Sequence, residues 1–298
     1  MEQRPFGNTG LNVSPIGFGG AAIWHAPGEK GGVEESEVNS LLNAMLDSGV
    51  TLIDTAGMYG LSEERLGRAI AHRRNEFILS SKCGYDRDGN EDWSAEAIAA
   101  GIDRSLTLLR TDRIDIMHLH SCEMEVLRQG EAIGALHQAV EAGKVRCAAY
   151  SGDNDELLWA VESGHFVSIQ TSLSICDQRC LDRALPHCAL NGLGVIIKRP
   201  LANAFWKFDT QPKGEYCEEY WRRAKAMQLE PGPLSWDELF LRFAAFQQGV
   251  SSIIIGTRRA EHFRRNVELL RKGPLPPEQV AALRELFKQH DHNWTGQI

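Results

Sequence analysis

The sequence has seven cysteines but no Cys-x-x-Cys pair. This spacing excludes a zinc knuckle and a thioredoxin-type redox motif, because both need paired cysteines. The number is odd, and the cysteines are scattered over 298 residues. We therefore expect free thiols in a reducing compartment rather than a disulfide framework.

Long apolar runs and a basic charge balance are also missing. The longest apolar stretches, Val195–Ile197 and Ile253–Ile255, are far too short to span a bilayer. The first residues lack the apolar core of a signal peptide, so we expect a cytoplasmic protein without a membrane partner. Lys and Arg number 32 against 40 Asp and Glu, a net charge of −8, which argues against nucleic acid as a partner. No long heptad pattern is present, so the sequence does not indicate an oligomeric state.

The composition is that of an ordinary globular protein. Hydrophobic residues make up 43% and charged residues 24%, which excludes a mainly disordered chain, a coiled coil and a collagen-like repeat. At roughly 150 residues per domain, the length allows two domains or one large α/β barrel. No shift in composition marks a boundary, so we expect a single domain over residues 1–298.

Short β-type runs alternate with helical patterns after a front hairpin, in which Arg4–Phe6 and Asn12–Ser14 flank a turn. The expected strands are Ile16–Gly19, Thr51–Asp54, Phe77–Lys82, Ile114–His120, Val145–Ser151, Ser168–Thr171, Gly194–Lys198 and Ser252–Ile255. The expected helices between and after them are Glu35–Ser48, Glu63–His72, Ala95–Leu109, Gly130–Ala142, Asp155–Ser163, Arg179–Leu190, Ser235–Gln248 and Ala260–Leu270.

Eight strand–helix units predict a (β/α)8 TIM barrel of the α/β class, which typically takes about 250 residues. The N-terminal β-hairpin and a C-terminal extra helix, Pro277–Gln289, would be additions to it. A doubly wound open sheet is the alternative, but Gly17–Gly20 lacks the G-x-G-x-x-G spacing. One long insertion, Leu201–Pro233, is rich in aromatic residues and carries a short helical pattern near Glu218–Met227.

Polar residues end several apolar strands, where a barrel of this kind carries its active site. Asp54, Lys82 and His120 end the second, third and fourth strands, and Tyr59 follows on the loop after Asp54. Each has a structural explanation on its own: a loop cap, a solvated lysine, an interior histidine and a loop aromatic. Together they predict one cluster, because a buried carboxylate and ammonium cost desolvation energy unless they pair.

These segments resemble the aldo-keto reductase family over almost the whole chain. Phe6–Gly19 is similar to the family's opening hairpin and first strand, and Leu52–Glu63 is similar to its signature around the aspartate and tyrosine. The resemblance implies an NADP(H)-dependent oxidoreductase, with NAD(H) left open, that reduces small-molecule aldehydes or ketones to alcohols. Its catalytic tetrad would be Asp54, Tyr59, Lys82 and His120.

The physical chemistry of these four groups suits that reaction. Tyr59 would be the general acid, since a neighbouring ammonium stabilises the phenolate that remains after proton transfer. Asp54 would keep Lys82 protonated and hold its ammonium in position beside Tyr59. His120 would orient the carbonyl and help to stabilise its developing negative charge.

The resemblance also implies a cofactor site in the second half of the chain. Its residues would be Ser151, Gln170, Lys198, Arg199, Pro200, Leu201, Gly256, Thr257, Arg258, His262 and Asn266.

Two cofactor segments depart from the family's pattern. Gly152 stands where Asn is usual, so that contact is lost or moves to Asp153 or Asn154. Lys198 stands where many members have an aromatic residue that stacks on the nicotinamide, and a basic residue there could approach the pyrophosphate. A pair of arginines at 258 and 259, beside a helix N-terminus, favours NADPH over NADH.

Trp24, Met58 and Tyr85 are predicted to line the substrate pocket, with Phe205 and Trp206 of the insertion nearby. The sequence does not choose among sugars, aliphatic aldehydes, aromatic aldehydes and steroids, nor between reduction and the reverse reaction.

Two other functions fit the same pattern. A cofactor-binding regulatory subunit would keep the fold without turnover. His118 and His120 could form half of a metal site in a barrel hydrolase, but the further ligands such a site needs are not apparent, so we predict no metal.

Overall fold

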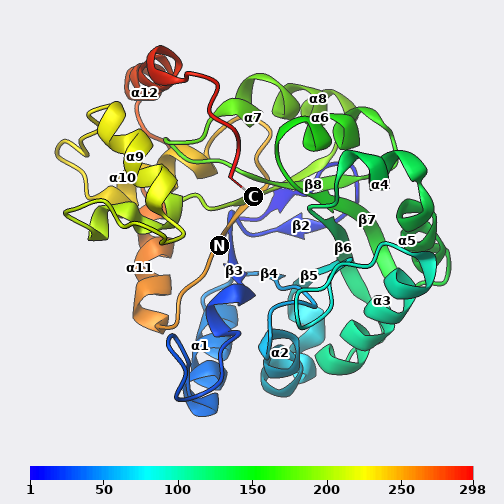
Figure 1. Cartoon of the computed structure of the whole chain (residues 1–298). Helices are drawn as coiled ribbons and strands as arrows, with labels where there is room; N and C mark the ends of the chain where they lie inside the picture. The colour runs from blue at the N-terminus through cyan, green and yellow to red at the C-terminus, as the bar shows by residue number, and fades with distance from the viewer. Residues whose placement is uncertain (298) are drawn as a thin grey trace.

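Eight parallel strands close into a barrel in the computed structural model, which describes residues 1–297 (Figure 1). The strands follow each other around the barrel in chain order, and the last pairs with the first. They are β3 Ile16–Gly19, β4 Leu52–Asp54, β5 Ile78–Cys83, β6 Ile114–His120, β7 Val145–Ser151, β8 Ser168–Ser172, β9 Gly194–Lys198 and β10 Ser252–Ile255. The predicted (β/α)8 fold is confirmed, and the strand bounds agree to within one residue.

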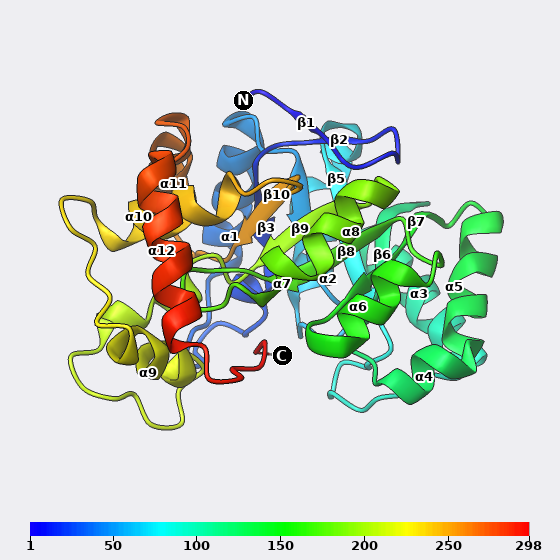
Figure 2. The ribbon, with the colours of Figure 1, turned by 90° about the horizontal axis from the view of Figure 1, so that it is seen from above.

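An N-terminal hairpin, β1 Arg4–Pro5 and β2 Asn12–Val13, closes one end of the barrel (Figure 2). Phe6 lies just after β1, is fully buried, and packs with strand side chains such as Leu52 and Ile116. A Cβ atom on Gly194 would lie 2.7 Å from the Phe6 ring, so this ring fits closely against the backbone of β9. The functional site must therefore use the other end of the barrel, where the strands have their carboxyl ends.

Helices surround the barrel, as Figure 1 shows. They are α1 Glu35–Asp47, α2 Ser62–Ile70, α3 Ala95–Leu109, α4 Met124–Gln129, α5 Glu131–Glu141, α6 Asn154–Glu162, α7 Arg179–Asp182, α8 Ala184–Asn191, α9 Glu218–Ala226, α10 Trp236–Ala245, α11 Ala260–Arg271 and α12 Pro277–His290. The described residues also form three short 3-10 helices, η1 Gly20–Ile23, η2 Ala71–Glu76 and η3 Ala202–Lys207. Among residues 1–297, every helix falls short of the length or the apolar character that crossing a bilayer requires.

The helix predicted over Arg179–Leu190 is two helices, α7 and α8, with a break at Arg183. Pro186 explains the break, because it has no N–H for the preceding turn and its ring clashes with the carbonyl four residues back. The sequence pattern also missed α4, a separate short helix that ends at Gly130 with φ of +77°. Both differences lie on the outside of the barrel.

The insertion between β9 and α10 forms η3 and α9 and lies at the mouth of the barrel beside α10 (Figures 1 and 2). Its Phe205 and Trp206 pack on Trp236 and Phe240 of α10. The Trp206 and Trp236 rings are stacked, with centroids 5.8 Å apart and planes 9° from parallel. The insertion is thus a fixed wall of the mouth, anchored by aromatic contacts.

Candidate active site

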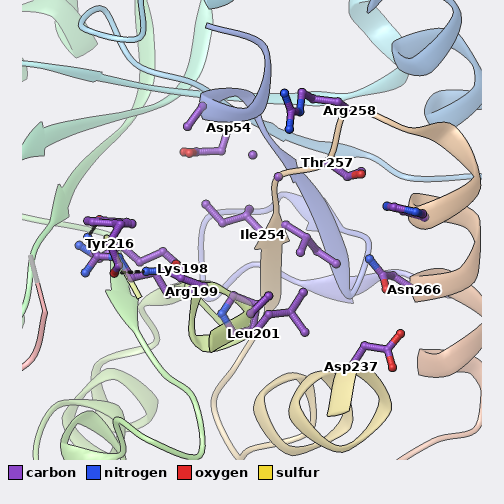
Figure 3. A pocket seen from close by; sticks show the side chains of 18 of the residues that line it. Asp54, Lys198, Arg199, Leu201, Tyr216, Asp237, Ile254, Thr257, Arg258 and Asn266 are labelled. Atoms are coloured by element: carbon purple, nitrogen blue, oxygen red, sulfur yellow. Dashed lines mark hydrogen bonds between the residues drawn. The ribbon is translucent and has the colours of Figure 1, made fainter. Parts of the chain in front are cut away.

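A cavity of about 1820 Å³ lies at the carboxyl ends of the barrel strands, and Figure 3 shows part of it. With one exception, all the predicted site residues line it: Trp24, Asp54, Met58, Tyr59, Tyr85, His120, Ser151, Gln170, Lys198, Arg199, Pro200, Leu201, Gly256, Thr257, Arg258, His262 and Asn266. The exception, Lys82, lies directly beneath the cavity wall in contact with Asp54. The structure therefore brings together the whole predicted set.

Lys82 and Asp54 form a buried ion pair between β5 and β4. The Lys82 Nζ donates to Asp54 Oδ2 at 2.6 Å and to the Thr55 carbonyl at 2.8 Å. Both residues are only 2% exposed. Burial by itself lowers the pKa of Lys82, but the negative charges of Asp54 and of an ionised Tyr59 outweigh it, and the net direction is upward. Lys82 is therefore an ammonium at neutral pH.

Tyr59 lies on the loop between β4 and α2, above this ion pair. The Lys82 Nζ is 5.0 Å from the centroid of the Tyr59 ring. The loop is held by a hydrogen bond between the Thr55 and Ser62 hydroxyls at 2.8 Å. It also needs glycine at position 60, where φ is +42° and a Cβ atom would lie 2.6 Å from the Trp24 carbonyl oxygen. The phenol is thus presented to the cavity by a tightly fitted turn.

His120 faces Tyr59 across the cavity floor. The two ring centroids are 5.9 Å apart with the planes at 82°, and Tyr85 also packs edge-on against His120, with the centroids 5.7 Å apart. Burial, followed by the positive charges of Lys82 and Lys198, holds the pKa of His120 well below its usual value. His120 is therefore a neutral imidazole at pH 7, able to donate a hydrogen bond without carrying a charge.

His118 lies one layer deeper in the barrel than His120 and is fully buried. Its Nε2 is 3.1 Å from the Ser80 hydroxyl, which donates to Asp54 Oδ1 at 2.8 Å. Among residues 1–297, no group of three or more His, Cys, Asp and Glu side chains is placed to hold a metal ion. His118 thus belongs to the hydrogen-bond support of Asp54.

Gln170 connects Asp54 to the second half of the site. Its Nε2 donates to Asp54 Oδ1 at 2.8 Å, and its Oε1 accepts from the Ser151 hydroxyl at 3.2 Å. Asp54 therefore accepts from three side chains, those of Ser80, Lys82 and Gln170. The sequence placed Gln170 at the mouth but did not reveal this link to Asp54.

Lys198, at the end of β9, pairs with Asp153. Its Nζ lies 2.9 Å from Asp153 Oδ2. The Asp153 side chain, to which the contact of the family's usual Asn could move, therefore pairs with a basic side chain. Arg199 has φ of +56° and donates to the Tyr216 hydroxyl and to the Gln297 carbonyl. The approach of Lys198 to a pyrophosphate, which the sequence suggested, stays a prediction.

The far end of the cavity lies at the N-terminus of α11. Thr257, Arg258, His262 and Asn266 line it, and Figure 3 shows three of them across the cavity from Lys198 and Arg199. Sequence reasoning missed two further lining residues there, Asp237 and Arg265, which form an ion pair at 3.0 Å. They stand 28 positions apart on α10 and α11, so no local pattern could have joined them.

The two parts of the cavity come from different parts of the chain. Asp54, Tyr59, Lys82 and His120 all belong to the segment from β4 to β6. The wall that begins at Ser151 is built from β7 to β10 and α11. Trp206 of the insertion also lines the cavity, whereas Phe205 is buried in the aromatic packing behind it.

A sequence model described as "Aldo/keto reductase family" matches residues 15–288. Similar curated proteins include the uncharacterized oxidoreductase YqkF of Bacillus subtilis, which is 28% identical over 97% of each chain. L-galactose dehydrogenase of Arabidopsis thaliana is 29% identical over 90% of this chain and 87% of its own. The NADH-specific methylglyoxal reductase of Escherichia coli is 27% identical over 91% of this chain and 94% of its own.

Among solved structures, the holo form of the aldo-keto reductase AKR11C1 from Bacillus halodurans is similar. It is 25% identical, with a TM-score of 0.83 over 96% of each chain.

Proposed function

Because the chain belongs to the aldo/keto reductase family of oxidoreductases, we propose that it reduces small-molecule aldehydes or ketones to alcohols with NADP(H). Members of this family generally bind a nicotinamide cofactor. The observation that carries the proposal is the Lys82 ammonium, held by Asp54 beneath the Tyr59 ring at the floor of the cavity.

The cavity suits a dinucleotide together with a small substrate. Its volume of about 1820 Å³ exceeds the roughly 300–1,000 Å³ of a site for one drug-sized ligand. Gly256 lets the backbone pass close to Gly19, since a Cβ atom there would lie 3.3 Å from the Gly19 carbonyl oxygen. The nicotinamide ring would supply the hydride, with Ser151 and Gln170 holding its carboxamide and Pro200 and Leu201 beside the pyrophosphate.

The α11 end of the cavity would bind the adenosine end of the cofactor. The N-terminus of α11 carries exposed backbone N–H groups, which favour an anion. Arg258 and Arg259 add two guanidinium groups, the side chains best suited to a ribose 2′-phosphate. We therefore favour NADPH over NADH, although one relative is named as NADH-specific.

Tyr59 would deliver the proton to the carbonyl oxygen as hydride reaches the carbon. A unit positive charge about 5 Å from a phenolate stabilises it by about 3 kcal/mol at an effective dielectric of about 20. Lys82 stands at such a distance from the Tyr59 ring and keeps its own proton because of Asp54. The neutral imidazole of His120 would donate a hydrogen bond to the same oxygen and so orient the carbonyl.

The first experiment is a titration with NADPH and NADH, followed by a panel of aldehydes and ketones. We expect tighter binding of NADPH and its oxidation with at least one carbonyl class. Equal affinities for the two cofactors would contradict the preference for NADPH. Tight binding without turnover across sugars, aliphatic, aromatic and steroid carbonyls would instead indicate a regulatory subunit.

The second experiment is the Tyr59→Phe variant. We expect kcat to fall about 100-fold or more, because general acid catalysis by a positioned group contributes about 10²- to 10⁴-fold. The Kd for NADPH should stay within about threefold, since Tyr59 is not among the residues proposed to hold the cofactor. Tyr220→Phe is the matched control, because Tyr220 is buried outside the cavity lining. Near wild-type turnover of Tyr59→Phe would falsify the role of Tyr59.

A further inference from the structure

A second buried ion pair stands in the cavity wall, across from the one that holds Lys82. The Lys198 Nζ lies 2.9 Å from Asp153 Oδ2, and the two side chains are 14% and 4% exposed. Within residues 1–297, this is the one ion pair of the Lys198 ammonium. Since an ammonium has three N–H groups, the others are free to face the cavity.

The two charges of this pair are not equally placed. Lys198 lines the main cavity, whereas Asp153 lies behind it and lines a smaller cavity on the other side. The Asp153 carboxylate is also fixed from behind, by the Thr171 hydroxyl at 2.7 Å and the Ser172 N–H at 2.8 Å. Anything bound in the main cavity therefore meets the positive end of the pair first.

The reactive ring of a nicotinamide cofactor must lie near this positive end. Hydride transfer needs the ring carbon about 3–3.5 Å from the carbonyl carbon. The carbonyl oxygen, on the proposed function, contacts Tyr59 and His120. Lys198 lines the same cavity as His120, and its charge is one of the causes that lower the pKa of that histidine.

The two redox forms of the cofactor differ in charge at this ring: the oxidised nicotinamide carries a positive charge and the reduced one is neutral. We propose that the Lys198–Asp153 pair sets the relative affinity for the two forms, with the Lys198 ammonium disfavouring the oxidised cofactor. This inference rests on the proposed function and deepens it. It makes release of oxidised cofactor easier and leaves the bound reduced cofactor a weaker hydride donor.

The test compares the Kd values of reduced and oxidised cofactor in wild type and Lys198→Met, by equilibrium titration without substrate. We expect the ratio of the oxidised to the reduced Kd to fall about tenfold in the variant, because a charge–charge repulsion is lost. For a two-electron couple, a tenfold change lowers the reduction potential of the bound cofactor by about 30 mV. Loss of the cation lowers the ratio whether Asp153 stays ionised or takes up a proton.

Three further variants keep the inference falsifiable. Lys198→Arg retains the charge and should keep the ratio within about twofold. Asp153→Asn removes the carboxylate that opposes the effect of burial on the pKa of Lys198, so the ratio should fall toward that of Lys198→Met as the pH is raised. Lys213→Met removes an exposed lysine of the insertion that does not line the cavity, and should leave the ratio unchanged.

The outcomes separate this inference from the proposed function. If Lys198→Met and Asp153→Asn bind both forms with the wild-type ratio, or with equal losses for both, the pair only positions the cofactor and the inference is wrong. If wild type binds neither form, the proposed function itself is wrong. A circular-dichroism melt confirms that each variant is folded before titration.

Discussion

At the scale of single residues, Lys82 keeps its proton although burial disfavours the charged form of its side chain. Asp54 provides the compensation, since its Oδ2 lies 2.6 Å from the ammonium. The pKa of Lys82 is raised in the folded protein, so the stability that the pair contributes is fully present at neutral pH. It is lost only as the pH rises through that raised value.

Asp54→Asn should move the pH profile and weaken the fold. Without the carboxylate, burial dominates and the pKa of Lys82 falls, so the alkaline limb of kcat should shift to lower pH. Breaking a buried pair costs about 3–5 kcal/mol, so the free energy of unfolding should fall by about 3 kcal/mol. A pH–rate profile and urea melts measure both effects.

Asp103→Asn is the control for this variant. Asp103 also pairs with a lysine, Lys144 at 2.5 Å, but the two side chains are 55% and 42% exposed. Such a surface pair contributes less than about 1 kcal/mol, and its loss should not move the pH profile. If both variants shift the pH profile and lower the free energy of unfolding equally, burial is not what makes the Asp54–Lys82 pair important.

Single residues of the site could be predicted from the sequence, but several of the contacts between them could not. Asp54, Lys82 and His120 could be predicted because each ends an apolar strand, and parallel strands in a barrel bring those ends together. Asp153 could not be assigned to Lys198, because the pairing depends on side-chain directions at the ends of two different strands. The same holds for the hydrogen bond from Gln170 to Asp54, which crosses the barrel.

At the scale of elements, the turn between β4 and α2 fixes the position of Tyr59. Gly60→Ala should displace this turn, because its Cβ atom would lie 2.6 Å from the Trp24 carbonyl oxygen. Since a shift of about 1 Å at a reacting group can cost about 100-fold in rate, we expect kcat to fall at least about tenfold. Steady-state kinetics and cofactor titration measure the loss.

Gly89→Ala provides the matched control for the turn. Gly89 has φ of +84°, so alanine there meets a comparable backbone strain, but nothing lies within 4 Å of its Cβ position. It should lose stability while keeping kcat. If both glycine variants lose kcat equally, the close fit of the turn is not what positions the phenol.

The helices were less predictable from sequence than the strands, for a local reason. The pattern over Arg179–Leu190 is amphipathic throughout, and the break at Arg183 comes from the ring of Pro186 acting on the turn before it. By contrast, Ser94, a residue type that favours the N-cap position, stands directly before the predicted helix Ala95–Leu109 and caps it, because its hydroxyl accepts from the Ala97 N–H. A cap that depends on one side chain and the backbone next to it can be predicted from sequence. A break inside a periodic helical pattern is harder to predict.

At the scale of the whole molecule, the two ends of the barrel have separate tasks. The strands were predictable to within one residue because strands buried on both faces form short apolar runs. One end is closed by the hairpin and Phe6, and the other carries the cavity. A change at the closed end should therefore alter stability without altering the site.

Phe6→Ala tests this separation. Removing a fully buried phenylalanine costs about 3–5 kcal/mol, so the midpoint of urea unfolding should fall strongly. The Kd for NADPH should stay within about twofold when measured well below that midpoint. Phe208→Ala, at a site that is 39% exposed, should cost less than about 1 kcal/mol. A large change in cofactor affinity in Phe6→Ala would show that the two ends are coupled.

The order of the site along the chain has a consequence for how such a protein can diverge. The groups proposed for proton transfer belong to β4 to β6, and the proposed cofactor wall begins only at Ser151. On the proposed function, substitutions in the later segment can change the cofactor preference while Tyr59 is unchanged. Exchange of the earlier segment would replace Met58 and Tyr85 of the predicted substrate pocket and leave the proposed cofactor wall unchanged. The two segments can therefore change largely separately, and the side-chain amide of Gln170 links them through its hydrogen bonds with Asp54 and Ser151.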